Sequence, residues 1–241
     1  MAAINAGCGL GGEAPMSIAK ATFCLMPEPH FNPIVYAAPG KMLIRVSVTG
    51  RAAHGARPTE GINAVTEAGK FLAALEVLES SSSPVMGVQR YVPLRINGGY
   101  RKYSLIVPEC CEIIISRQLV PGETCESVLS DLRGLIGGGQ YSAKFAFDVL
   151  PPYYPPYETD QTDPRTLRLM EIAERVTGQS MSLACGTSVS DANCITGLCG
   201  IPVLIFGPEG RNLHQANEWV SLESMSQVLE VYRMFIGLER G

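Results

Sequence analysis

The chain has 241 residues, 46% of them hydrophobic and 17% charged, with a formal net charge of −4. This composition is typical of a globular protein that is long enough for one large or two smaller cores. The sequence has no run of Lys and Arg and no apolar stretch of the roughly 20 residues that span a bilayer, which argues against nucleic-acid and membrane partners. We therefore expect a small-molecule or peptide partner.

The N-terminus lacks the basic and apolar regions of a signal peptide, so the expected location is the cytoplasm. The eight cysteines are scattered and form no CxxC pair, which fits buried thiols in that location. The alternative is a nucleophilic cysteine, for which Cys185, before Gly186 and Thr187, is the best candidate.

Residues 42–150 are predicted to form one compact unit with the element order β-α-β-β-α-β. Each helix carries a single apolar stripe that can pack on a sheet, which indicates the ferredoxin-like plan. The proline-rich residues 151–156 follow as a stiff connection and mark a domain boundary. The predicted elements are strand 42–49, helix 63–78, strand 91–96, strand 112–119, helix 124–135 and strand 142–150.

Beyond the prolines, the sequence alternates helix and strand, which indicates an α/β domain with part of a sheet. Asp163 and Pro164 are typical of a helix start, and Gly178 of its end. A strand at 181–184, a helix at 190–196, a buried strand at 201–206 and a helix from Ser221 should follow. The last helix is expected to bury Leu222, Met225, Leu229, Tyr232 and Ile236.

Two loops carry candidate functional histidines. His214 follows the buried strand 201–206, and ligands of open α/β sheets gather beyond the carboxyl ends of such strands. His54 lies in a polar loop between a strand and a helix. A single histidine of this kind is more often a surface residue than a ligand, so its partners must decide.

Together with three shorter segments, these loops resemble the zinc-dependent metallohydrolases that include acetylornithine deacetylase, succinyl-diaminopimelate desuccinylase, aminoacylase and glutamate carboxypeptidase. The likeness covers almost the whole chain. The matching segments, in chain order, are 26–29, 49–65, 105–122 with Ser116 and Arg117, 186–191 and 206–220.

The resemblance implies a ferredoxin-like α+β lid, residues 41–151, inserted in a partial α/β zinc-peptidase-like catalytic domain formed by residues 1–40 and 152–241. It implies a homodimer through the lid, and a small N-acyl amino acid or dipeptide-like substrate. Zinc would be the cofactor, with Glu28 and His214 each binding one ion of a two-metal site.

The remaining roles that the resemblance implies concern the substrate. His54 of the partner lid would polarise the substrate carbonyl, Arg117 would clamp a carboxylate, and Gly186 and Thr187 would donate hydrogen bonds. Alternatives stay open: Glu28 as a plain loop carboxylate, and Arg117 as a salt bridge in the lid.

Three further residues are expected to have structural roles or to lie at the surface. His30 is expected to be a solvent-exposed loop residue and not an extra ligand. Asp191 is expected to cap the short helix, and Glu218 to order the His214 loop.

The sequence also departs from the family. It has no HxD pair, no bridging aspartate and no adjacent Glu-Glu pair, which in relatives supplies the general base. Residues 11–14 resemble the segment that follows this pair, so the chain is expected to start just after a missing half. We therefore expect a member or fragment of an amide-bond hydrolase, of the deacylase or carboxypeptidase type, that is inactive alone. The alternative is a non-catalytic dimerisation or ligand-binding module.

Overall fold

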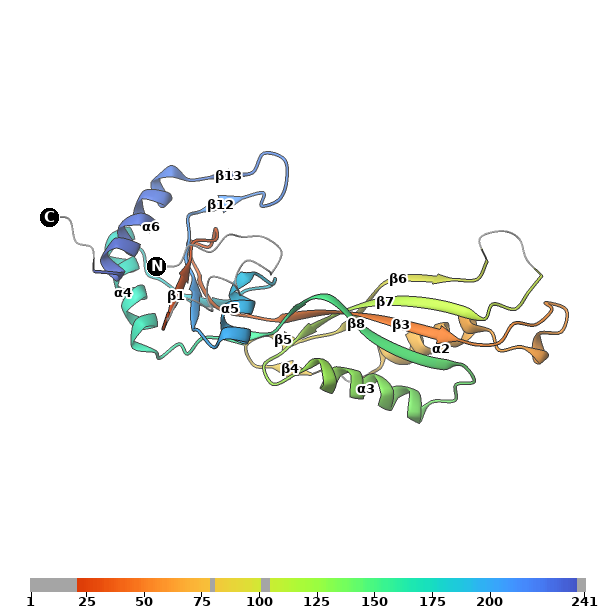
Figure 1. Ribbon diagram of the computed structural model, residues 1–241. Coiled ribbons are helices and arrows are strands. Elements are labelled where there is room, and N and C mark those ends of the chain that lie inside the picture. The colour runs from red at the N-terminus through yellow and green to blue at the C-terminus, as the bar shows by residue number, and fades with distance from the viewer. Residues whose placement is uncertain (1–20, 79–80, 101–104, 238–241) are drawn as a thin grey trace. The chain divides into compact units, whose positions relative to one another are not determined.

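The computed structural model describes residues 21–78, 81–100 and 105–237, which form two compact units (Figure 1). Unit 1 runs up to Pro39 and resumes at Tyr154, and unit 2 spans Gly40–Tyr153. The boundaries predicted from the sequence are residues 41 and 151. The segment 11–14, compared above with the family, lies outside the described residues.

Unit 2 contains a four-stranded sheet in the order β6-β7-β3-β8, with α2 and α3 on one face (Figure 1). The β-α-β-β-α-β order predicted for this region is confirmed, with a small β4-β5 hairpin added after α2. The bounds are β3 Gly40–Thr49, α2 Ala64–Glu76, β4 Ser82–Ser83, β5 Gly87–Val88, β6 Tyr91–Gly98, β7 Cys110–Leu119, α3 Cys125–Gly138 and β8 Lys144–Tyr154.

The core of unit 2 follows from the alternation of side chains along β3 and β7. Alternate residues of β3, from Met42 to Val48, are buried against the helices, and Phe71 of α2 and Leu132 of α3 fill the space above them. Strand β8 continues four residues beyond its predicted end at 150 and includes two prolines. An edge strand tolerates proline because its outer N–H groups need no partner.

Unit 1 contains a mixed sheet in the order β1-β11-β2-β10, with β9 paired to β2. Strand β1 runs parallel to β11, and β2 runs antiparallel to β11. The predicted strand at 201–206 lies inside this sheet. The bounds are β1 Cys24–Met26, β2 Ile34–Ala38, β9 Tyr157–Glu158, β10 Leu183–Cys185 and β11 Val203–Ile205.

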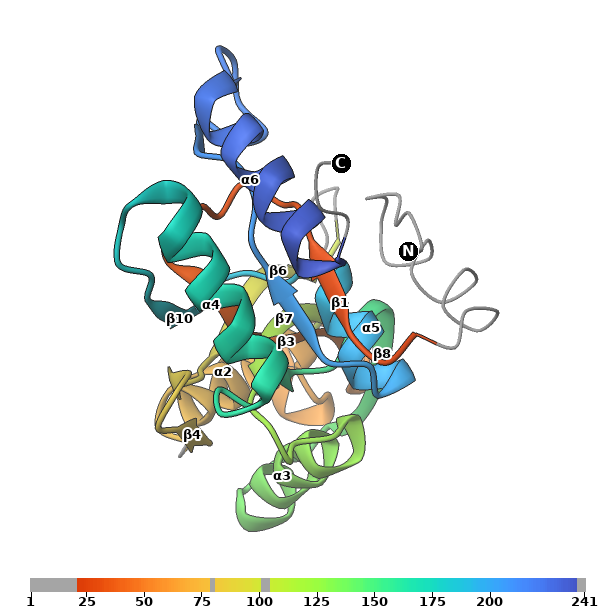
Figure 2. The same ribbon diagram turned by 90° about the vertical axis from the view of Figure 1, so that its left-hand side faces the viewer.

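Three helices pack on this sheet. Helices α4, Pro164–Thr177, and α6, Leu222–Phe235, lie side by side, and α5, Asp191–Cys199, contacts β9 and β11 (Figure 2). As predicted, Asp163 caps α4 by accepting a hydrogen bond from the Arg165 N–H, and Gly178 ends it in the left-handed conformation. No helix in the described ranges is long and apolar enough to cross a bilayer.

The buried face of α6 differs from the predicted one. Val228, Val231 and Tyr232 are buried, whereas Leu222, Met225, Leu229 and Ile236 are exposed by 76%, 44%, 61% and 46%. The helix carries apolar residues on two faces, so helical periodicity alone does not tell which face meets the sheet.

Candidate functional site

Glu28 lies in a loop that follows β1 and is tied to the loop after β11. The His30 N–H donates to the Glu28 carbonyl over 2.7 Å, and the Gly207 N–H donates to the His30 carbonyl over 3.0 Å. A Cβ atom on Gly207 would stand 1.9 Å from the Glu28 carbonyl oxygen. The two loops therefore meet only because residue 207 is glycine, and the predicted ligand Glu28 is held on a fixed backbone.

The charge environment of Glu28 involves Asp191 and His214. Partial burial raises the pKa of the Glu28 carboxyl, the negative charge of Asp191 raises it further, and the positive charge of protonated His214 lowers it. The structure thus brings the two predicted zinc ligands, Glu28 and His214, within electrostatic reach of each other.

Asp191 does not have the helix-capping role that was predicted for it from the sequence. Ser190, not Asp191, caps α5, because its side chain accepts a hydrogen bond from the Ala192 N–H. Asp191 is 8% exposed, and its Oδ2 atom has no hydrogen-bond partner in the described structure. Ser and Asp are both favoured at helix N-caps, so the sequence alone does not tell which of these two neighbouring residues is the cap and which is buried.

Tyr157 on β9 is the second buried polar group beside Glu28. Its side-chain hydroxyl is buried without a hydrogen-bond partner among the described residues. Burial raises the pKa of Tyr157, and the charges of Glu28 and Cys185 raise it further. Unpartnered buried polar atoms are uncommon and call for an explanation, which favours this corner of unit 1 as a functional site.

The loop that carries His214 has an unusual backbone. It connects the two strands of a hairpin, β12 Gly210–Arg211 and β13 Trp219–Val220. Asn212, His214 and Asn217 have φ angles of 58°, 59° and 62°, in the left-handed region that non-glycine residues seldom adopt. The Glu218 carboxylate accepts the His214 N–H over 3.3 Å, which confirms the predicted ordering role of Glu218. His214 is exposed.

Gly186 and Thr187 follow β10 at the turn into α5. The Gly186 N–H donates to the Ala37 carbonyl over 2.7 Å, so it is already engaged within the sheet. Thr187 is exposed. Nearby, burial and the charge of Glu158 raise the pKa of Cys185, which keeps its thiol protonated and argues against the nucleophile alternative.

His30 is half-buried rather than exposed, which corrects the prediction for this residue. Its burial comes from the contact between the two loops, which sequence analysis did not foresee. Burial lowers the pKa of the His30 imidazole, because the charged form loses solvation.

His54 in unit 2 is exposed on the loop after β3. Its Nδ1 atom accepts the Ala56 N–H over 3.2 Å. In a neutral imidazole with Nδ1 as acceptor, the proton sits on Nε2. His54 therefore offers an Nε2–H donor, as the predicted carbonyl-polarising role requires.

Arg117 on β7 is 1% exposed and has partners inside unit 2. Its guanidinium pairs with Glu123 over 2.6 Å, lies 4.9 Å from the Tyr91 ring centroid and donates to the Gln118 carbonyl. This matches the alternative interpretation, an internal salt bridge. A substrate carboxylate would have to displace Glu123.

The donor set for zinc is incomplete in the described residues. No group of three His, Cys, Asp or Glu side chains within them is arranged to hold a metal ion. A catalytic zinc ion takes three protein ligands and a water molecule. Glu28 and His214 have the right chemistry for two of these ligands, but these two alone do not make a zinc site.

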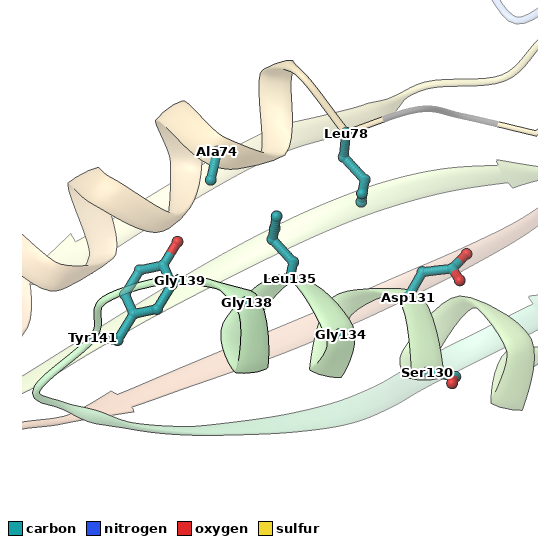
Figure 3. A pocket seen from close by; sticks show the side chains of 9 residues that line it. All are labelled: Ala74, Leu78, Ser130, Asp131, Gly134, Leu135, Gly138, Gly139 and Tyr141. Atoms are coloured by element: carbon teal, nitrogen blue, oxygen red, sulfur yellow. The ribbon is translucent and has the colours of Figure 1, made fainter.

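Unit 2 contains a groove that holds none of the predicted site residues. It has a volume of about 660 Å³ and lies between α2 and α3, where Ala74, Leu78 and Leu135 form its apolar walls (Figure 3). Tyr141 and Asp131 line it as well. Three glycines of α3 and its C-cap also line the groove.

Comparison with known proteins identifies unit 2. Residues 36–142 match the M20_dimer family, described as a peptidase dimerisation domain. These residues are similar to an M20 peptidase dimerisation domain. The family resemblance drawn from the motifs is thereby confirmed, and the chain is similar to the M20 peptidases and deacylases.

Relatives extend the match beyond the M20 dimerisation domain. YgeY of Escherichia coli K12 is 27% identical over 218 residues, covering 81% of this chain and 52% of YgeY. Acetylornithine deacetylase of Edwardsiella ictaluri is 24% identical over 217 residues, covering 83% and 52%. Succinyl-diaminopimelate desuccinylase of Methylorubrum extorquens is 24% identical over 222 residues, covering 87% and 55%. The chain spans about half the length of these relatives.

Solved structures show the same fold. Aminopeptidase PepT from Bacillus cereus aligns with a TM-score of 0.79 at 21% identity, covering 95% of this chain and 61% of that chain. A tripeptidase from Staphylococcus aureus aligns with a TM-score of 0.73 at 21% identity, covering 94% and 61%. The fold predicted from sequence is confirmed.

Proposed function

We propose that this chain acts in the metal-dependent hydrolysis of an amide bond in a small N-acyl amino acid or dipeptide-like substrate. The observation that carries the proposal is the charge interaction between Glu28, in the loop after β1, and His214, in the loop of the β12-β13 hairpin. The names of the relatives, a deacetylase and a desuccinylase, support the class of reaction.

In this proposal Glu28 and His214 each supply one ligand to zinc, and further ligands come from residues other than the described ones. When bound, zinc would polarise the amide carbonyl and lower the pKa of a water molecule. Glu28 is suited to its task because its backbone is fixed by His30 and Gly207. His214 is suited because its loop is held by Glu218.

Further residues act on the substrate in this proposal. The Nε2–H of His54 from a partner subunit stabilises the developing oxyanion. Thr187 contributes its hydroxyl group next to the substrate, whereas the predicted Gly186 N–H donor is engaged by the Ala37 carbonyl. Arg117 has the weakest support in the predicted set, because Glu123 already occupies its guanidinium.

We also propose that the chain forms a homodimer through unit 2, as the M20 dimerisation domain suggests. A cytoplasmic location is part of the proposal. It is supported by the seven described cysteines, none of which forms a disulfide with another, as is usual in a reducing compartment.

A non-catalytic dimerisation or ligand-binding module is the second candidate. One observation favours it: the described residues do not bring three metal ligands together. Zinc binding separates the two candidates.

The test is zinc binding to the metal-free chain, measured by competition with a chromophoric chelator. The hydrolase proposal expects weak binding that Glu28→Gln and His214→Ala each weaken by about tenfold or more, since each removes a ligand. The control His54→Ala removes an exposed imidazole from unit 2 and should leave the affinity unchanged. Equal affinity in all four proteins would favour the non-catalytic module.

The same proposal predicts that the purified chain shows no appreciable hydrolysis of N-acyl amino acids. The sequence has no adjacent Glu-Glu pair to supply the general base, a group that contributes a factor of about 10² to 10⁴. Steady turnover that is abolished by chelation and by Glu28→Ala would contradict this prediction.

A further inference from the structure

A polar pocket lies directly beside the Glu28 loop. It has a volume of about 430 Å³, and its wall includes the chain from Pro29 to Pro33 together with Gln179, Glu209 and Gly210. This volume falls within the range of about 300 to 1,000 Å³ found for small-molecule sites. The pocket wall begins at Pro29, the residue that follows the candidate metal ligand Glu28 in the chain.

The backbone that forms the pocket is held from two sides. On one side, the carbonyl of His30 accepts the Gly207 N–H over 3.0 Å. On the other, the Ser224 Oγ accepts the Glu209 N–H over 2.9 Å, and the Glu209 carbonyl accepts the Ser221 N–H over 2.8 Å. The pocket is therefore preformed, and the Glu209 side chain is not needed to hold it together.

The Glu209 carboxylate provides the charge of this pocket. Among the described residues it has no ion-pair or hydrogen-bond partner, although its backbone is fully engaged. The amide of Asn32 is used internally, since it donates to the Ser180 carbonyl and accepts from Ser182. His30 is the other titratable side chain of the wall, and an ordinary histidine is neutral at pH 8.

We propose that this pocket binds a primary ammonium group of the substrate, with Glu209 as its charge partner and the Gln179 amide oxygen as a further acceptor. An ammonium group presents three donors on a compact charge, which suits one carboxylate and neighbouring neutral acceptors. A metal ion would need three ligands, which this wall does not supply. The proposal rests on the proposed function in assigning the ammonium group to the substrate.

The test is isothermal titration calorimetry on the full chain at pH 8, at low ionic strength and with EDTA present. The probes are Nα-acetyl-lysine amide, its uncharged counterpart Nα-acetyl-norleucine amide, and n-butylamine. The lysine probe should bind about fivefold more tightly than the norleucine probe, as expected for one partly exposed charge pair. Binding of n-butylamine would show that the ammonium group suffices, and its failure would show that an amino-acid frame is needed too.

Two variants locate the binding. Glu209→Gln should remove the preference for the lysine probe, and Gln179→Ala should reduce it. The matched control Glu223→Gln neutralises an exposed acid of α6 outside the pocket and should leave binding unchanged. Equal binding of both amide probes, an unchanged preference in Glu209→Gln, or no binding of the lysine probe would overturn the proposal. Since EDTA is present, each of these results is independent of zinc binding at Glu28 and His214.

Discussion

At the scale of single residues, the charges of Asp191 and Glu28 interact in unit 1. The two carboxylates interact in a partly buried part of unit 1, and the positive charge of His214 partly compensates for them. Removing the negative charge of Asp191, whose buried Oδ2 atom has no hydrogen-bond partner among the described residues, relieves repulsion and desolvation together.

We therefore predict that Asp191→Asn lowers the pKa of Glu28 and raises the free energy of unfolding by about 1 kcal/mol. The sign follows from the charge of Asp191, which disfavours the ionised form of Glu28 and so raises its pKa. Carbon-13 NMR titration of Glu28 and urea denaturation give the two readouts. Glu158→Gln is the control, because Glu158 acts on Tyr36 and Cys185 and not on Glu28. An unchanged pKa of Glu28 in Asp191→Asn would show that the two groups do not interact.

Arg117 and Glu123 form the buried ion pair of unit 2, with side chains 1% and 9% exposed. We predict that Arg117→Ala lowers the free energy of unfolding by about 3 to 5 kcal/mol, because it leaves the Glu123 carboxylate buried without its cation. The double variant Arg117→Met with Glu123→Leu should recover much of this loss in a denaturation experiment. A stable Arg117→Ala chain that had lost affinity for a substrate would instead support the carboxylate clamp.

At the scale of elements, Glu67 joins α2 to the start of β8. Its carboxylate accepts the Ser142 and Ala143 N–H groups over 2.6 and 3.3 Å and the Lys70 ammonium over 2.6 Å. Burial alone would raise the pKa of Glu67, but these hydrogen bonds and the charge of Lys70 outweigh it and lower the pKa.

Because the pKa of Glu67 is lower in the folded state, its contribution to stability is present above the unfolded pKa and is lost as pH falls through the folded pKa. We predict that Glu67→Gln lowers the free energy of unfolding at pH 7 by about 1 to 3 kcal/mol. The difference in this free energy between the variant and the parent chain should narrow below about pH 4. Urea denaturation across pH 3 to 7 measures this. Glu126→Gln, an exposed acid of α3, should keep the acid dependence of the parent. A gap that stayed constant with pH would contradict the assignment.

The elements that sequence predicted well are those whose signals are local. The start and end of α4 are encoded by Asp163, Pro164 and Gly178, and the strands of unit 2 by their alternation. The two-residue strands, β1 and β2 were not predicted. A strand of two residues carries no periodicity, and β2 is buried along its whole length, so its residues do not alternate. The face of α6 was wrong because the helix is apolar on two sides.

The candidate site was predictable only where a local sequence motif marks its residues. Motifs pointed to Glu28 and His214 individually, and the structure places them within electrostatic reach of each other. The burial of Asp191 and Tyr157 beside Glu28, and the partner of Arg117, depend on packing. Such contacts leave no local pattern in the sequence, so they had to come from the fold.

At the scale of the whole molecule, the two edges of the unit 2 sheet differ in character. On β6, Val92, Leu94 and Ile96 are exposed by 51%, 58% and 50%. On β8, the exposed positions include Lys144 and Asp148. Charges on an edge strand discourage pairing with another chain, whereas an exposed apolar edge favours it. The β6 edge is therefore the better candidate for the proposed homodimer contact.

We predict that the chain is a dimer in light scattering after size exclusion, and that Leu94→Lys shifts it to a monomer. The substitution places a charge in the contact of two β6 edges related by a two-fold axis, and each such contact would contain the charge twice. Leu94 is exposed in the single chain, so the variant should keep its fold, which circular dichroism can verify. Ala146→Lys, on the opposite edge at β8, is the matched control and should remain a dimer.

A parent chain that stays monomeric at all concentrations would contradict both the proposed dimer and the proposed role of His54 in a neighbouring subunit. A dimer that survives Leu94→Lys but dissociates in Ala146→Lys would move the contact to the β8 edge.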